Sequence, residues 1–128
     1  MASQLPALIT ILTLFLLAFV AGNVGRARGK FGIHAPATTG HPDFERVYRV
    51  HMNTLENTLL FLPSLWLFAQ YVSPLYAGIL GAVWILSRIW YAQAYGSGGN
   101  RGPAFGISLG ANAILLVGAT IGLIKAML

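Results

Sequence analysis

The feature that most constrains this chain is a series of long apolar stretches with almost no charge. Residues 5–24 contain no charged side chain, and roughly 20 apolar residues are enough to cross a bilayer as a helix. Over the whole chain, 9% of residues are charged and 56% are hydrophobic, whereas soluble domains carry about 25% charged residues. So few charges cannot cover a water-facing surface, and the composition predicts an integral membrane protein.

Four helices are predicted from the apolar pattern and from the loop residues between them. The chain is long enough for one domain, and we expect residues 1–128 to form a single membrane domain. The expected spans are residues 5–24, 44–71, 75–95 and 104–127. Because only a very short turn separates the second and third helices, they must run antiparallel as neighbours. The predicted fold is therefore all-α, an antiparallel four-helix transmembrane bundle.

Glycine, proline and acidic residues mark the expected helix ends. The first helix is expected to end near Gly25, which leaves residues 25–42 as a polar loop. Asp43 is the expected N-cap of the second helix, because a side-chain oxygen at that position accepts backbone N–H groups. Pro63 lies inside the second helix and is expected to kink it. The Gly-rich segment 96–103 predicts the loop before the last helix.

Basic residues predict which side of the membrane each loop faces. They gather in the first and third loops, as Arg26, Arg28, Lys30 and Arg101, whereas residues 71–74 contain none. By the positive-inside rule, the first and third loops face the cytoplasm and both termini lie on the opposite side. The net charge of +5 is thus explained by membrane topology, and we expect no nucleic-acid partner because there is no soluble basic face to bind one.

Two of the predicted helices carry polar side chains that are costly at membrane depth. On the second helix, the spacing i, i+4, i+7 places three of them on one face: Arg49, Asn53 and Glu56. On the third helix, the spacing i, i+3, i+7 groups Arg88, Tyr91 and Tyr95. Because the two helices are expected to be antiparallel neighbours, both polar faces should lie near the same membrane surface, where they could converge.

The chemistry of these groups suits a small peptide with carboxylates and an amine. Arginines bind carboxylates in a bidentate manner, a glutamate binds an ammonium group, and amides and phenols bind peptide groups. Glutathione has this pattern, and it brings a thiol to a chain that has no cysteine. A purely structural interpretation also remains open: Glu56 could pair with Arg88 to join two helices, and Tyr91 and Tyr95 could be aromatic residues of the membrane interface.

Two further patterns concern metals and helix packing. The three histidines of the chain have no metal-ligand spacing, so no metal site is predicted. In the last helix, glycines recur four residues apart, a spacing that lets helix backbones approach closely. The pairs are Gly106 with Gly110 and Gly118 with Gly122. Packing within one chain and packing between subunits both explain these pairs.

The segment from Thr38 to Glu56 resembles the signature of the MAPEG family, the membrane-associated proteins in eicosanoid and glutathione metabolism. The pattern Glu-Arg-x-x-Arg-x-x-x-Asn-x-x-Glu is present as Glu45, Arg46, Arg49, Asn53 and Glu56. A second, downstream pattern is matched by Arg88, Tyr91, Gln93 and Tyr95. The resemblance covers nearly the whole chain. It implies a homotrimer of four-helix subunits, with glutathione bound between adjacent subunits.

The same resemblance implies a role for each site residue. The glutathione site would be lined from one subunit by Arg49, Asn53, Glu56, Tyr91 and Tyr95, and from its neighbour by Arg28 and His51. The candidate catalytic groups are Arg101 and Tyr95, which would stabilise the glutathione thiolate. Arg101 lies about one residue closer to Tyr95 than the spacing of the leukotriene-synthase branch.

The function implied is that of a membrane-bound glutathione transferase or peroxidase, in which glutathione is the co-substrate. The thiolate would be conjugated to lipophilic electrophiles or would reduce lipid hydroperoxides that arrive from the surrounding membrane lipid. The alternative is a non-catalytic lipid-binding or scaffold protein with the same fold. A small proton-coupled exporter is disfavoured, because the arginines near Glu56 would keep its carboxylate ionised.

Overall fold

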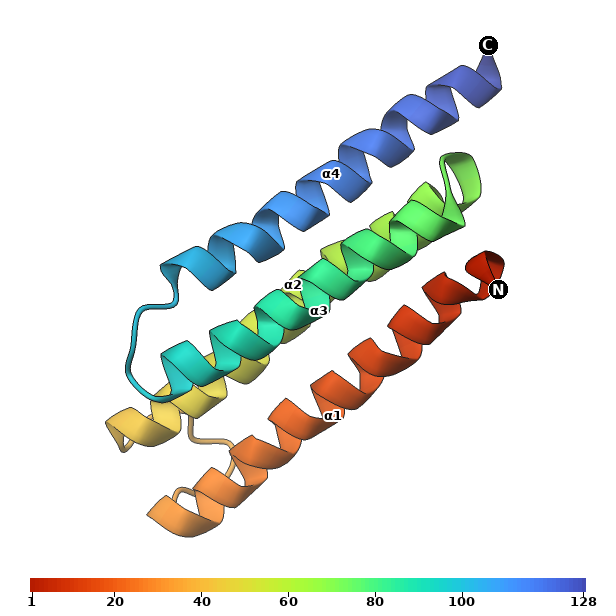
Figure 1. The fold of residues 1–128 in the computed structure, drawn as a ribbon. Coiled ribbons are helices and arrows are strands. Elements are labelled where there is room, and N and C mark those ends of the chain that lie inside the picture. Colours follow the sequence, from red (N-terminus) through yellow and green to blue (C-terminus); the bar gives the residue numbers. More distant parts are fainter.

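The computed structural model describes residues 1–128 and contains helices but no strands, which confirms the predicted all-helical class. A short 3-10 helix, η1 (Ala2–Gln4), precedes four long helices: α1 (Leu5–Phe31), α2 (Pro42–Tyr71), α3 (Pro74–Gly96) and α4 (Gly102–Met127). Figure 1 shows α2 and α3 lying between α1 and α4. Both termini and the α2–α3 turn lie at one end of the bundle, and the other two loops lie at the opposite end.

Helix α1 continues well past the predicted end near Gly25, so the predicted loop over 25–42 is wrong in its first part. The helix stops at Phe31 because Gly32 adopts a left-handed conformation (φ 66°), which a helix C-terminus favours. The N–H groups of Gly32 and Ile33 both donate to the Arg28 carbonyl. The basic residues expected in a loop therefore lie on the last turns of α1, where cations interact favourably with the helix dipole.

Helix α2 begins at Pro42, two residues before the predicted start at residue 44, and the predicted N-cap, Asp43, is wrong. His41 is the N-cap, and its Nδ1 accepts a hydrogen bond of 3.1 Å from the Asp43 backbone N–H. Pro42 takes the first helical position, where its fixed φ suits a helix start. The helix then runs without interruption through Pro63 to Tyr71.

Three helical segments are long and apolar enough to cross a membrane: Ala2–Phe31, Pro74–Gly96 and Gly102–Met127. Helix α2 is not among them, although it is 30 residues long. Instead it packs against each of the other three long helices. Large apolar side chains such as Phe15, Leu86 and Val117 are exposed on the outside of those other helices. An apolar outer surface of this kind suits lipid rather than water.

The bundle is joined by close contacts between its helices in the apolar half of α2. The rings of Phe61 and Trp84 stack with centroids 3.9 Å apart, and both residues are fully buried. On α3, Gly81 lets α1 approach, because a Cβ added there would lie 2.7 Å from Ile9. These contacts align α1, α2 and α3 and thereby fix the polar residues further along the same helices.

The glycine pairs of α4 differ from each other in their surroundings. A Cβ added at Gly118 would lie 2.5 Å from the Phe68 ring, and one at Gly122 would lie 2.6 Å from the Tyr71 carbonyl oxygen. This pair therefore serves packing within the chain. An added Cβ would meet nothing within 4 Å at the other two positions, Gly106 and Gly110.

Candidate functional site

Arg88 is the central polar residue of the bundle and is fully buried. Its Nη2 donates to Asn53 Oδ1 at 2.6 Å and to Thr54 Oγ1 at 3.0 Å, both on α2. Its Nη1 donates to Ser108 Oγ on α4 at 3.3 Å. A charge inside a membrane bundle needs such partners to offset its lost hydration. The network therefore links three helices around one guanidinium group.

Tyr91 lies one turn further along α3 and connects Arg88 to the loop before α4. The Arg88 guanidinium carbon is 4.2 Å from the centroid of the Tyr91 ring, a cation–π contact. The ring is almost fully buried, and its hydroxyl accepts a weak hydrogen bond of 3.5 Å from Arg101 Nη1. The Tyr91 ring thus contacts the buried guanidinium of Arg88, whereas the Tyr91 hydroxyl contacts the exposed guanidinium of Arg101.

Arg101 and Tyr95 form the accessible end of this arrangement. The Arg101 guanidinium carbon is 4.4 Å from the Tyr95 ring centroid, and the Tyr91 and Tyr95 rings are 5.7 Å apart. Arg101 itself is exposed. Both Arg101 and Tyr95 line a pocket of about 490 Å³ together with Arg46 and residues 98–100. Guanidinium and phenol groups at such a pocket can stabilise an anion that enters it.

Arg49 and Glu56 lie on the outer surface of α2 and are exposed, whereas Asn53 is half-buried and faces α3. The expected shared face of the three residues is therefore divided, because Asn53 binds Arg88. The alternative of a direct Glu56–Arg88 pair is not observed, since every partner of Arg88 is a neutral oxygen. Within one chain, neither Arg49 nor Glu56 lines the pocket at Arg101.

Arg28 and His51 lie apart from the other predicted site residues within a single chain. The Arg28 Nη1 donates to the Ala37 carbonyl at 2.7 Å, and its guanidinium carbon lies 5.1 Å from the Phe44 ring centroid. This contact fastens the α1–α2 loop to α1. His51 is half-buried on α2. The chain also has no group of three or more His, Asp and Glu side chains that could bind a metal ion.

Sequence reasoning missed the polar residues that α4 contributes. Besides Ser108, α4 provides Asn112, whose Nδ2 donates to Asn57 Oδ1 at 2.9 Å; Trp84 Nε1 donates to the same oxygen at 3.4 Å. A signal was present, because Ser108 and Asn112 are the polar residues of an otherwise apolar stretch and are spaced i, i+4 on one helix face.

Comparison with known proteins identifies the group to which this arrangement belongs. The sequence model that describes the MAPEG family matches residues 6–121 of this chain. The chain belongs to the MAPEG family. This confirms the resemblance read from residues 38–56 and 88–95. MAPEG proteins are membrane-bound, in agreement with the three apolar helices of this chain.

Several known proteins are similar to this chain over most of their length. An uncharacterized protein of Synechocystis sp. is 51% identical over 93% of this chain and 88% of its own. Microsomal glutathione S-transferase 2 of Bos taurus is 34% identical over 98% and 87%, respectively. Leukotriene C4 synthase of Cavia porcellus is 36% identical over 94% and 81%.

Proposed function

We propose that this MAPEG protein is a membrane-bound glutathione transferase with glutathione-dependent peroxidase activity. The observation that supports this most directly is the Arg101 guanidinium, stacked on Tyr95 and facing the Tyr91 hydroxyl at the edge of a pocket. Relatives named as a glutathione transferase and a leukotriene synthase agree with it. An anion-stabilising group at an accessible pocket is what thiolate chemistry requires.

Glutathione would be bound by groups that are complementary to its own charges. Its carboxylates would accept hydrogen bonds from Arg49 and Arg28, its ammonium would donate to Glu56, and Asn53 and the two tyrosines would contact its peptide groups. His51 would approach from a neighbouring subunit together with Arg28. The exposure of Arg49 and Glu56 on α2 supports this assignment, because a second copy of the chain would cover them and complete the site.

The proposed assembly is a homotrimer of antiparallel four-helix subunits. In each subunit, the two loops at the Arg101 end of the bundle would face the cytoplasm, which supplies glutathione. Both termini would lie on the other side of the membrane. The lipophilic co-substrate would enter from the bilayer along the apolar outer surface of the helices. Detoxification of such lipophiles is the role that this arrangement suits.

The chemistry would depend on keeping the glutathione sulfur ionised. The thiol proton would leave to water in the open pocket, and Arg101 and Tyr95 would stabilise the thiolate that remains. In transfer, the sulfur forms a bond to the electrophilic carbon while the leaving group departs with its electron pair. In peroxide reduction, the sulfur attacks the peroxide oxygen, and a second glutathione then releases oxidised glutathione, with an alcohol and water as the other products.

Turnover by purified protein in detergent, with glutathione and a model aryl halide or a lipid hydroperoxide, tests the proposal. We expect Arg101→Ala to lower kcat about 100-fold, the effect of removing one anion-stabilising group, with a much smaller change in glutathione affinity. Lys125→Ala, which removes a cation from the last turn of α4, is the matched control and is expected to behave as the unmodified protein.

Two outcomes would count against the proposal in different ways. Loss of glutathione affinity with an unchanged kcat in Arg101→Ala would make Arg101 a binding residue only. Failure to turn over any electrophile or hydroperoxide, with no thiolate absorbance when glutathione is added, would favour the non-catalytic lipid-binding or scaffold member of the fold.

A further inference from the structure

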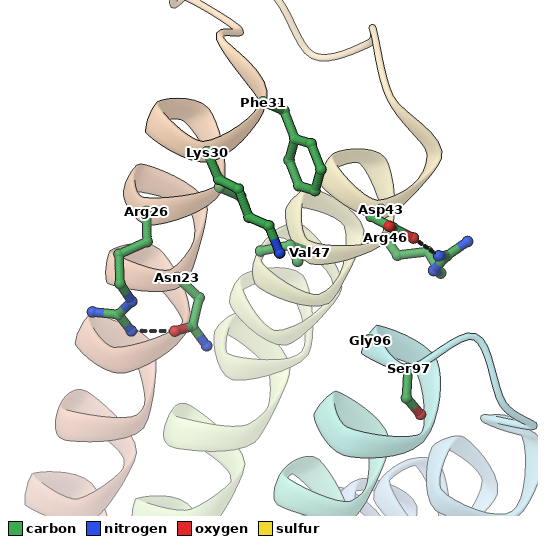
Figure 2. A pocket seen from close by; sticks show the side chains of 10 residues that line it. Asn23, Arg26, Lys30, Phe31, Asp43, Arg46, Val47, Gly96 and Ser97 are labelled. Carbon is green, nitrogen blue, oxygen red and sulfur yellow. Dashed lines mark hydrogen bonds and ion pairs between the residues drawn. The ribbon is translucent and has the colours of Figure 1, made fainter.

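A second pocket lies at the same end of the bundle, between the end of α1, the start of α2 and the end of α3. It has a volume of about 510 Å³ and is distinct from the pocket at Arg101, although Arg46 lines both. Figure 2 shows Arg26 and Lys30 on the α1 side, Asp43 and Arg46 on α2, and Ser97 beyond them at the end of α3. None of the glutathione-site residues proposed above lines this pocket.

The charges around this pocket do not cancel. Arg46 forms an ion pair with Asp43, and Arg26 donates a hydrogen bond to the neutral side chain of Asn23. Lys30 has no ion-pair partner, and Figure 2 shows its ammonium group directed into the space between α1 and α2. Three cations and one carboxylate leave two uncompensated positive charges. The pocket is therefore suited to an anion.

A smaller, apolar crevice adjoins this cationic pocket. It has a volume of about 140 Å³, shares Asn23, Val47 and Gly96 with the pocket, and is otherwise lined by apolar side chains. Those side chains are Val20, Val50 and Ala92. The crevice lies beside the uncharged stretch 5–24 of α1, and the cations follow directly after that stretch. A cationic pocket beside an apolar crevice matches an amphipathic ligand whose anionic end lies at the membrane surface.

We propose that this site binds an anionic phospholipid, with the headgroup phosphate beside Lys30 and Arg26 and part of an acyl chain in the crevice at Ala92. Basic pockets between transmembrane helices have the charge that such headgroups need. Free phosphate carries the same charge but has no chain to place in the crevice. The site is separate from the proposed glutathione site, so this inference does not depend on the enzymatic function.

The test compares lipid retention by the full-length protein in phosphatidylcholine nanodiscs with and without phosphatidylglycerol, measured by native mass spectrometry. Lys30→Gln is expected to weaken phosphatidylglycerol retention about five-fold, which is the effect of one basic residue near an anionic surface. Arg26→Gln combined with Lys30→Gln should weaken it further. Lys125→Gln removes the same charge from the far end of α4 and should retain phosphatidylglycerol normally.

The two halves of the proposed site can be separated by further arms of the same experiment. Ala92→Leu, which fills the crevice without changing charge, should also reduce phosphatidylglycerol retention. If instead inorganic phosphate displaces the lipid and Ala92→Leu has no effect, the site takes a soluble anion and the lipid proposal is wrong. Equal losses in Lys30→Gln and Lys125→Gln would show only a general surface potential and would also overturn it. Loss of glutathione turnover is not expected in either lysine variant.

Discussion

Replacing the buried Arg88 by methionine is the sharpest test of how the site is organised. Methionine fills similar volume without charge, and replacing buried ionic groups by apolar ones is often neutral or stabilising. Here the neighbouring groups argue for a net loss. Ser108 keeps its hydrogen bonds to the Ala104 carbonyl and to Ser87. The half-buried Asn53 side-chain oxygen and the buried Thr54 hydroxyl lose their partner, which lies at 2.6 Å and 3.0 Å.

The expected cost follows from the groups left without partners. Side-chain hydrogen bonds inside membrane proteins average about 0.6 kcal/mol and reach about 1.7 kcal/mol, and a stranded buried acceptor costs about 1–3 kcal/mol. We therefore expect Arg88→Met to lower the free energy of unfolding by about 2 kcal/mol. The variant should also bind glutathione more weakly, because Asn53 and the Tyr91 ring lose their common anchor.

The measurement is reversible unfolding in mixed micelles followed by far-ultraviolet circular dichroism, with the double variant Arg88→Met/Asn53→Leu beside the single one. Removing the stranded amide should restore the part of the stability that Asn53 costs, while the Thr54 hydroxyl stays without its partner and glutathione affinity stays low. Wild-type stability in Arg88→Met, or additive losses in the double variant, would show that the network around Arg88 does not determine the stability of the bundle.

Two further predictions concern the packing of α4 and the exposed face of α2. Gly118→Ala should destabilise the protein by about 1–3 kcal/mol, because the added methyl group overpacks against Phe68. Gly110→Ala should raise the free energy of unfolding by up to about 1 kcal/mol through helix propensity. Equal thermal shifts in the two variants would contradict this. Because the chain has no cysteine, Glu56→Cys provides a unique thiol. It should react with a water-soluble maleimide in native membranes, whereas Leu86→Cys on the apolar outside of α3 should be unreactive. Two equally inert thiols would argue against a hydrated site beside α2.

The number and type of helices could be predicted from apolar length alone, but the end of α1 could not. Gly25 marks the start of the predicted loop, which also contains Gly29, yet both glycines lie within the helix. A glycine inside a helix costs about 1 kcal/mol, which tertiary contacts of the same turn can offset. Here Val24 and Ala27 are buried in a cluster with Phe44. That packing depends on a residue of the next helix, which local sequence does not reveal.

The site was predictable within each helix and less so between helices. Helical spacing grouped Arg88, Tyr91 and Tyr95, and the structure has Tyr91 in contact with both of the others. Spacing could not show that Arg88 would take its partners from α2 and α4, because the rotation of one helix against another is set by packing. Nor could spacing show that Arg28 contacts the Ala37 carbonyl, because helical periodicity says nothing about the path of the loop after α1.

The position of α2 reconciles two opposing demands on this fold. A helix that carries polar groups such as Asn53 and Glu56 loses the hydropathy needed to face lipid, and α2 is the long helix that is not apolar enough to span a membrane by itself. It can lie among apolar helices only where neighbours cover its polar groups, and α2 contacts all three of the others. The apolar α3 also contacts all three other helices, so a central position does not require low hydropathy, but it allows α2 to carry polar groups that lipid would not solvate. Arg49 and Glu56 remain exposed on α2 in the single chain, and they are the residues that the proposed glutathione and the proposed second subunit would cover.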